Sequence, residues 1–173
     1  MGRIQKIGFG GGCHWCTEAV FQSLIGVEQV EQGWIASEGE AATFSEAVIV
    51  HYRPEEIALA VLVEIHLYTH KSTSQHSMRE KYRSAIYYFD HGVKESLSCI
   101  LEQLNPQFDH QLITQILPFT NFKASREALQ NYYYSNPKKP FCETFINPKL
   151  KLLLQRFSEY ADHVNLEHLN KRP

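Results

Sequence analysis

Several features that would assign the chain to a special class of protein are missing from its sequence. No apolar run is long enough to span a bilayer, and the opening letters, MGRIQKIGFGGG, lack the apolar core of a signal peptide. The same letters lack the Ser or Thr of a myristoylation signal. Basic residues are not in excess, because 17 Lys and Arg stand against 19 Asp and Glu. The sequence therefore predicts a cytoplasmic protein with no membrane partner and no nucleic-acid partner.

Repeats and low-complexity segments are also absent. Of the 173 residues, 43% are hydrophobic, 12% aromatic and 21% charged, which is the composition of a folded protein. This length favours one domain with a sizeable core, or a domain with a tail. We expect the domain at 1–157 and a charged C-terminal tail at 158–173.

Cysteine is scarce, with four residues in the chain. Thiols stay reduced in the cytoplasm, so these four do not predict a disulfide scaffold. A zinc site usually takes two CxxC pairs, and the chain has one, at Cys13 and Cys16. His66 and His70 have the spacing of two metal ligands, but Leu67 stands where a zinc-protease helix needs Glu. We expect no bound metal.

Hydrophobic periodicity, together with helix-start and turn signals, predicts alternating strands and helices. The expected strands lie at 3–9, 27–36, 44–52, 81–89 and 111–119. The expected helices lie at 13–24, 54–70, 92–104, 125–136 and 147–164. The first six elements follow the order β-α-β-β-α-β, which matches the split βαβ of ferredoxin-like folds. The predicted fold is an α+β, ferredoxin-like two-layer sandwich with a mixed sheet, flanking helices and a C-terminal extension.

The stretch GGGCHWCTEAVF points most directly to chemistry. Cys13 follows three glycines at the expected start of a helix, where exposed N–H groups and the helix dipole favour a thiolate. Cys16 lies on the same side of the first turn, a spacing that suits a disulfide able to form and open. Taken alone, the pair is also consistent with a thioredoxin-like dithiol, a metal knuckle or inert packing. Cys99, on an apolar helical face, is expected in the core.

Four motifs, in order, resemble those of the peptide methionine sulfoxide reductase A family. They are GGCHWCTEAVF, SEAVIVHYRP, YRSAIY at 82–87 and QNYYYSNPKKPFCETFINPKL. Order and approximate spacing agree over 4–157. The resemblance implies an enzyme that reduces the S epimer of methionine sulfoxide, free or in proteins, with 1–157 as its catalytic domain.

The resemblance also implies roles for individual residues. Cys13 matches the nucleophile whose thiolate attacks the sulfoxide sulfur. Glu46 matches the carboxylic acid that protonates the sulfoxide oxygen, and Tyr82 matches a tyrosine that hydrogen-bonds it. Trp15 matches the aromatic wall that holds the S-methyl group.

The second half of the implied reaction needs another thiol. Loss of methionine leaves Cys13 as a sulfenic acid, which a resolving cysteine attacks. Cys16 is the local candidate and Cys142, in the last motif, is the alternative. Thioredoxin or another dithiol would then reduce the disulfide, with no bound cofactor. Two other functions stay open: a general dithiol–disulfide oxidoreductase acting on protein disulfides, and a non-catalytic domain that binds sulfoxides or a metal.

The sequence departs from the family pattern around the expected substrate site. His14 stands where the family has Phe, so it either loosens the methyl pocket or places a cation beside Cys13, unless it is an exposed helix-start residue. The segment between Trp34 and Ser45 is short and lacks the Pro-Thr-Tyr motif that supplies a second oxygen donor. Ser77 or His76 could replace that donor.

Overall fold

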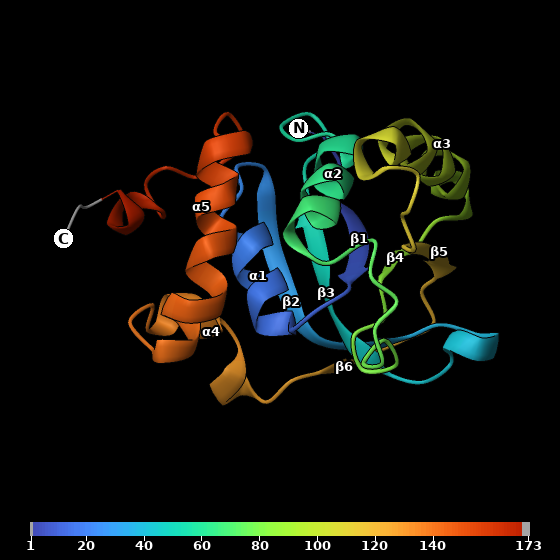
Figure 1. The fold of residues 1–173 in the computed structure, drawn as a ribbon, viewed down its shortest axis with the longest axis horizontal. Coiled ribbons are helices and arrows are strands. Elements are labelled where there is room, and N and C mark those ends of the chain that lie inside the picture. The colour runs from blue at the N-terminus through green and yellow to red at the C-terminus, as the bar shows by residue number, and fades with distance from the viewer. Residues whose placement is uncertain (1, 171–173) are drawn as a thin grey trace.

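The computed structural model describes residues 2–170, which form a six-stranded mixed sheet flanked by helices (Figure 1). The strands are β1 (Gln5–Gly10), β2 (Val27–Ala36), β3 (Ser45–Tyr52), β4 (Ala85–Tyr88), β5 (Gln115–Pro118) and β6 (Asn121–Ala124). The helices are α1 (His14–Gln22), α2 (Leu59–Thr69), α3 (Lys94–Leu104), α4 (Tyr132–Ser135) and α5 (Asn147–Arg156). The predicted α+β class, with a mixed sheet and flanking helices, is confirmed.

The strand order across the sheet is β5-β4-β1-β3-β2-β6. Neighbouring strands are antiparallel except β4 and β5, which are parallel. Strands β1 and β3 are therefore central, and the turn that leaves β1 for α1 emerges near the middle of the sheet. Among residues 2–170, no helix is long and apolar enough to cross a membrane.

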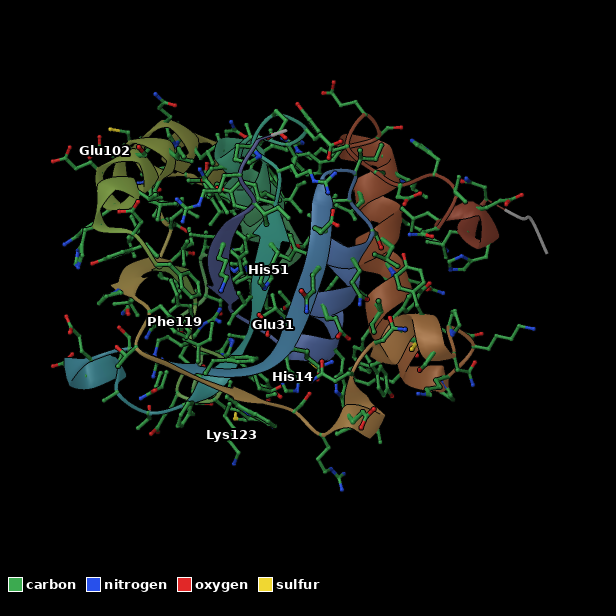
Figure 2. All side chains as sticks on the ribbon, turned by 180° about the vertical axis from the view of Figure 1, so that it is seen from behind. His14, Glu31, His51, Glu102, Phe119 and Lys123 are labelled. Atoms are coloured by element: carbon green, nitrogen blue, oxygen red, sulfur yellow. The ribbon has the colours of Figure 1, made fainter. Side chains whose placement is uncertain are left out.

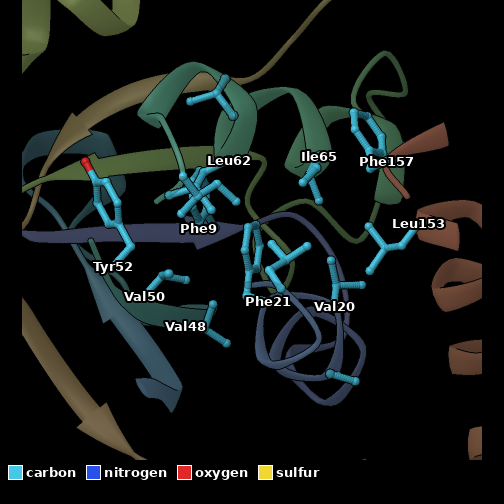
Figure 3. Close-up of a cluster of buried hydrophobic side chains, with 14 of the residues drawn as sticks. Phe9, Val20, Phe21, Val48, Val50, Tyr52, Leu62, Ile65, Leu153 and Phe157 are labelled. Atoms are coloured by element: carbon cyan, nitrogen blue, oxygen red, sulfur yellow. The ribbon is translucent and has the colours of Figure 1, made fainter. Parts of the chain in front are cut away.

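The main core lies between the sheet and the helices that cover one of its faces. Helices α1 and α2 lie in front of the strands in Figure 1, whereas the view from behind in Figure 2 meets the strands first. In this core the rings of Phe9 and Phe21 stack with centroids 4.7 Å apart (Figure 3). Burial of such side chains is the largest stabilising contribution available to the fold.

Alternation along β3 decides which of its side chains face α1. Val48 and Val50 belong to the main core, whereas Ala47 and Ile49 belong to a smaller cluster on the other face. Glu46 has the same parity as Val48, so its carboxyl is directed towards α1. This register brings an acid to the N-terminus of that helix.

The face of the sheet away from α1 is partly polar. On that face His51 of β3 and Glu31 of β2 form a cross-strand pair, with Nε2 2.7 Å from Oε2 (Figure 2). This pair shares no side-chain contact with the cysteine-bearing turn, because it lies on the opposite face.

The helix expected at 125–136 does not form as one element. A 3₁₀ turn and the short α4 replace it. The buried Glu18 carboxyl on α1 accepts the backbone N–H groups of Asn131 and Tyr132, and Asn131 takes a left-handed φ of 54°. A left-handed residue interrupts a right-handed helix. The prediction was wrong because a distant carboxyl fixes this backbone.

Other element boundaries differ for similar reasons. The strand expected at 81–89 is limited to β4, because the Arg79 side chain binds the Tyr82 carbonyl. The helix expected at 54–70 is preceded by a turn in which the Arg53 carbonyl accepts two N–H groups. Strand β6 was not predicted, since its one large apolar residue, Phe122, gives no alternation.

Residues 158–170 lie against the rest of the molecule. Ala161 forms a β-bridge with Leu24, Leu166 is buried, and the Tyr133 hydroxyl contacts Nε2 of His168 at 2.7 Å. The helix expected to run to 164 ends at Arg156. The boundary at 157 stays a prediction, and the ends of the two predicted segments, residues 1 and 171–173, lie outside the described residues.

Candidate active site

The turn between β1 and α1 presents the first cysteine. Gly11 has a φ of 154°, and a Cβ there would collide with the His70 ring, so this position requires glycine. Cys13 then takes the N-cap position of α1, where its carbonyl accepts the N–H groups of Cys16 and Thr17. Its side chain is half-buried at the end of the helix that carries unpaired N–H groups.

The two thiols of the CxxC pair differ in their tendency to ionise. The Cys16 thiol donates a hydrogen bond to Cys13, and this bond, helped by the N–H groups of Trp15 and Cys16, lowers the pKa of Cys13. Burial and the nearby Glu46 oppose this change without outweighing it. The same bond, with burial, raises the pKa of Cys16. Cys13 is therefore the more readily ionised thiol of the pair, and Cys16 the less readily ionised one.

Glu46 occupies the space beside the start of α1. Its side chain is buried, and Oε1 accepts the backbone N–H of His14 at 3.3 Å. Nε2 of His14 lies 3.4 Å from the same oxygen, and Nζ of Lys81 lies 3.7 Å from Oε2. The predicted acid thus lies within electrostatic reach of Cys13, between an imidazole and an ammonium group.

A cavity of about 400 Å³ opens in front of Cys13. Cys16, Tyr82 and His76 line it as well, so the structure brings together four residues that the sequence had selected. The other lining residues are Gly11, Gly12, His70, Lys71, Met78, Phe141, Phe145 and Lys149. The walls are largely apolar and aromatic, and cationic or titratable groups stand at intervals along them.

Five residues that the sequence selected do not line this cavity: His14, Trp15, Glu46, Ser77 and Cys142. Trp15 stacks on Tyr132 with ring centroids 4.1 Å apart and meets Phe141 edge-on at 5.3 Å. Trp15 therefore supports the cavity wall from behind, through Phe141. Ser77 is exposed on the loop between α2 and β4.

The other two cysteines lie in contrasting surroundings. Cys142 is fully buried at the start of a π-helical turn, Cys142–Ile146, and burial raises the pKa of its thiol. Cys99 is exposed on α3, so the prediction that it lies in the core was wrong. Leu97 and Leu104 form the buried side of α3, and Cys99 is two residues from Leu97, which turns it away from that side.

Arg79 organises the loop that carries Tyr82, and the sequence had not selected it. The residue is buried although the loop itself is largely exposed. Its guanidinium donates to four backbone carbonyls, those of Gly11, Lys71, Ser74 and Tyr82. Arginine offers five donors in a fixed fork, which suits this clamp. Its place just before the YRSAIY motif is the only sequence signal that could have indicated it.

Lys149 reaches the cavity from α5 and also escaped the sequence analysis. Its ammonium group donates to the Thr69 carbonyl at the end of α2. Burial lowers the pKa of Lys149, and the two cysteines Cys13 and Cys16 oppose that change. The lysine in turn favours ionisation of Cys16. A lysine thus stands close enough to Cys16 to influence its ionisation.

The buried His66 and the partly buried His70 lie beneath the glycine turn. The rings of His66 and His70 stack 4.1 Å apart. Nε2 of His66 lies 2.8 Å from the Gly10 carbonyl, while His70 contacts the His66 carbonyl and the Ser84 hydroxyl. Burial lowers the pKa of both imidazoles, that of His70 to about 3. Among residues 2–170 no group of three or more His, Cys, Asp or Glu is placed to hold a metal ion.

These histidines predict that acid destabilises the protein. The folded state keeps both imidazoles neutral, whereas the unfolded chain protonates them below about pH 6.5. The free energy of unfolding should therefore fall as the pH drops below 6.5, by up to about 1.4 kcal/mol per pH unit for each histidine. Denaturant titrations between pH 7.5 and pH 5 measure this slope. His70→Asn should be less stable at pH 7.5 but have a shallower slope, and an unchanged slope would contradict the assignment.

A low-pKa cysteine, a hydrogen-bonded second thiol, and a tyrosine facing an aromatic cavity define a thiol-dependent oxidoreductase site. The family model described as peptide methionine sulfoxide reductase matches residues 5–161, and the chain belongs to that family. The peptide methionine sulfoxide reductase MsrA of Acinetobacter baumannii (strain SDF) is 30% identical over 168 residues, which cover 89% of this chain and 96% of the relative.

Solved structures share the fold. Mxr1 from Saccharomyces cerevisiae in its reduced form superposes with a TM-score of 0.72 at 23% identity, covering 83% of this chain and 91% of that one. Mxr1 in complex with Trx2 superposes with a TM-score of 0.61 at 23% identity, covering 75% of this chain and 85% of that one. At this identity the two structures support the architecture.

Proposed function

We propose that this protein reduces the S epimer of methionine sulfoxide, free or in proteins, to methionine. The observation that carries the proposal is that Cys13, whose pKa the Cys16 thiol lowers, faces a cavity that it shares with Tyr82. Family membership supplies the reaction, since the matched model and the A. baumannii relative are both described as peptide methionine sulfoxide reductases.

The first step is attack of the Cys13 thiolate on the sulfoxide sulfur. The oxygen takes a proton from Glu46, and the sulfur–oxygen bond breaks as the hydroxyl group passes to the Cys13 sulfur. The bond that the attack formed between the two sulfur atoms breaks as well, which leaves Cys13 as a sulfenic acid. Methionine leaves with its sulfur reduced by two electrons. Tyr82 lines the same cavity, which supports a role for its hydroxyl as a hydrogen-bond donor to the oxygen, where negative charge develops.

The second step returns the enzyme to its dithiol form. The Cys16 sulfur attacks the sulfenic sulfur of Cys13, and the hydroxyl group leaves as water with the Cys16 proton. Thioredoxin then reduces the disulfide by thiol–disulfide exchange. The half-buried position of Cys13 and the yeast Mxr1 complex with Trx2 support an external protein dithiol as reductant. No bound cofactor takes part in this scheme.

The test compares the two epimers. Thioredoxin, its reductase and NADPH are supplied, and loss of NADPH absorbance is followed with S- and R-methionine sulfoxide. Turnover is expected with the S epimer and not with the R epimer. If the folded protein reduces neither epimer, the proposed function is wrong.

Replacement of Cys16 by Ser tests the resolving step. Serine can still donate a hydrogen bond to Cys13 but cannot form a disulfide, so activity with dithiothreitol should persist while thioredoxin-driven turnover slows. Cys142→Ser is the matched control and should retain both activities. Mass spectrometry of the oxidised wild type should find Cys13 linked to Cys16. If Cys142→Ser alone loses thioredoxin-driven turnover, the resolver is Cys142.

The alternative function, a general dithiol–disulfide oxidoreductase, is not favoured, since the family model accounts for most of the chain.

We also propose that strands β1 to β4, with α1 and α2, form a ferredoxin-like two-layer core within residues 1–157. The antiparallel order β4-β1-β3-β2 supports this topology. A cytoplasmic location is part of the proposal, because a reducing compartment keeps Cys13 and Cys16 as thiols.

A further inference from the structure

His14 does not occupy the place that the family resemblance gives to an aromatic wall. It is the first residue of α1, and its buried side chain lies beside β2 (Figure 2). Its ring meets the Trp34 ring edge-on, with the ring centroids 5.0 Å apart. Nδ1 lies 2.7 Å from the Gly33 carbonyl. A carbonyl only accepts, so Nδ1 carries a hydrogen and the second nitrogen, Nε2, is left for another partner.

That second partner is Glu46. Nε2 lies 3.4 Å from Oε1 of the carboxyl, and both side chains are almost wholly buried. This contact is an ion pair when the imidazole is protonated, and burial shields it from water. The backbone N–H of His14 also donates to Oε1, which fixes the carboxyl in this orientation.

Other titratable and charged groups lie near the pair. They are Cys13 and Glu18 from the α1 segment, Lys81 from the loop before β4, and Lys123 of β6, which lies over the Trp34 ring. Lys81 favours the carboxylate of Glu46 from the solvent side, where its own side chain is 57% exposed. Without His14, the acid would face this cation with no buried group to hold the proton.

We propose that His14 and Glu46 share one proton across the Nε2–Oε1 contact, and that His14 is a positioning residue that keeps Glu46 loaded as the proton donor. The inference rests on the proposed reduction of methionine sulfoxide. As the sulfur–oxygen bond breaks, the shared proton passes through Oε1 to the sulfoxide oxygen, leaving a neutral imidazole and a carboxylate.

The proton is recovered in the reductive step. The external dithiol loses two protons and two electrons when it reduces the Cys13–Cys16 disulfide. One proton restores the Cys16 thiol, and the other reaches the His14–Glu46 pair through solvent. The two protons thus balance the water formed over the whole cycle.

The test measures the pH profile of kcat/KM for S-methionine sulfoxide with dithiothreitol. His14→Gln keeps a donor for the Gly33 carbonyl but cannot titrate. Its alkaline limb should move about one unit to lower pH, giving roughly tenfold lower kcat/KM at pH 8, while activity at pH 6 approaches that of the wild type. Lys81→Met is the matched control, because it removes the cation that favours the carboxylate, and its limb should not move to lower pH.

If the alkaline limbs of the pH profiles of His14→Gln and the wild type coincide, the inference is overturned and the proposed function is unaffected. A wild type that does not reduce the sulfoxide would overturn the function itself. If His14→Gln does not fold, ¹⁵N NMR of the wild type and of Glu46→Gln decides. Nδ1 of His14 should stay protonated in both proteins, and the titration midpoint of His14 Nε2 should be lower in Glu46→Gln than in the wild type. Equal midpoints in the two proteins would contradict a shared proton.

Discussion

Replacing Cys13 with Ser should abolish reduction of methionine sulfoxide with thioredoxin and with dithiothreitol alike. Serine fits the N-cap position of α1, so the fold should be retained. Its hydroxyl does not ionise near neutral pH and cannot accept the transferred oxygen as a sulfenic acid. Loss of the nucleophile of a covalent mechanism costs about 10³-fold or more in turnover. The NADPH-coupled assay and direct quantification of methionine measure the effect.

Cys99→Ser provides the matched control for this variant. It makes the same chemical change at an exposed thiol on α3 and should leave turnover unchanged. The lowered pKa of Cys13 gives a second readout, because one thiol should react rapidly with iodoacetamide at pH 7 in the wild type and be missing in Cys13→Ser. Full activity in Cys13→Ser would assign the nucleophile to another cysteine.

The parts of the fold that follow from sequence are those in which local signals and tertiary packing agree. The alternation of β3 and the glycine turn before Cys13 each predict one element, and both elements form. Helix α4 and strand β6 could not be predicted, because partners far away in the sequence determine them. Glu18 fixes the backbone at Asn131, and β6 pairs with the edge of β2 although its own sequence has no strand pattern.

The candidate site also contains some residues that the sequence predicted and others that it did not. Cys13, Cys16 and Tyr82 belong to short motifs, and the structure brings them to one cavity. The rest of the cavity is built by residues whose position depends on the fold. Phe141 and Phe145 supply aromatic walls from a segment far downstream, where the sequence had indicated Trp15 and His14. Their contribution could be seen only after α5 and the π-helical turn were placed against α1.

The connection between β2 and β3 does not take part in the cavity. A 3₁₀ turn, Gly39–Ala41, occupies that connection, and it contributes no residue to the described cavity lining. The loop before β4 takes over one side of the cavity with His76, Met78 and Tyr82, and the clamp of Arg79 on four carbonyls fixes it. The loop before β4 and the C-terminal segment thus supply most of the side chains that line the cavity.

Replacing Glu46 with Gln should reduce kcat for sulfoxide reduction by about 10²- to 10⁴-fold with dithiothreitol as reductant. The amide oxygen can still accept the His14 backbone N–H, so the local structure should be retained. The amide cannot supply a proton to the sulfoxide oxygen, and the oxygen then leaves as a far poorer group. Single-turnover measurements of methionine release report this step without the resolving and recycling reactions.

Disulfide chemistry at Cys13 separates this effect from a general loss of reactivity. Thiol–disulfide exchange with dithiodipyridine or with insulin needs the thiolate and no acid at Glu46, so Glu46→Gln should exchange at least as fast as the wild type. Glu31→Gln makes the same substitution on the opposite face of the sheet, beside His51, and should retain both activities. Equal losses of exchange and sulfoxide reduction in Glu46→Gln would mean that the carboxyl supports the thiolate and is not the proton donor. Undiminished sulfoxide reduction would place the donor elsewhere, with the hydroxyl of the cavity-lining Tyr82 as the next candidate.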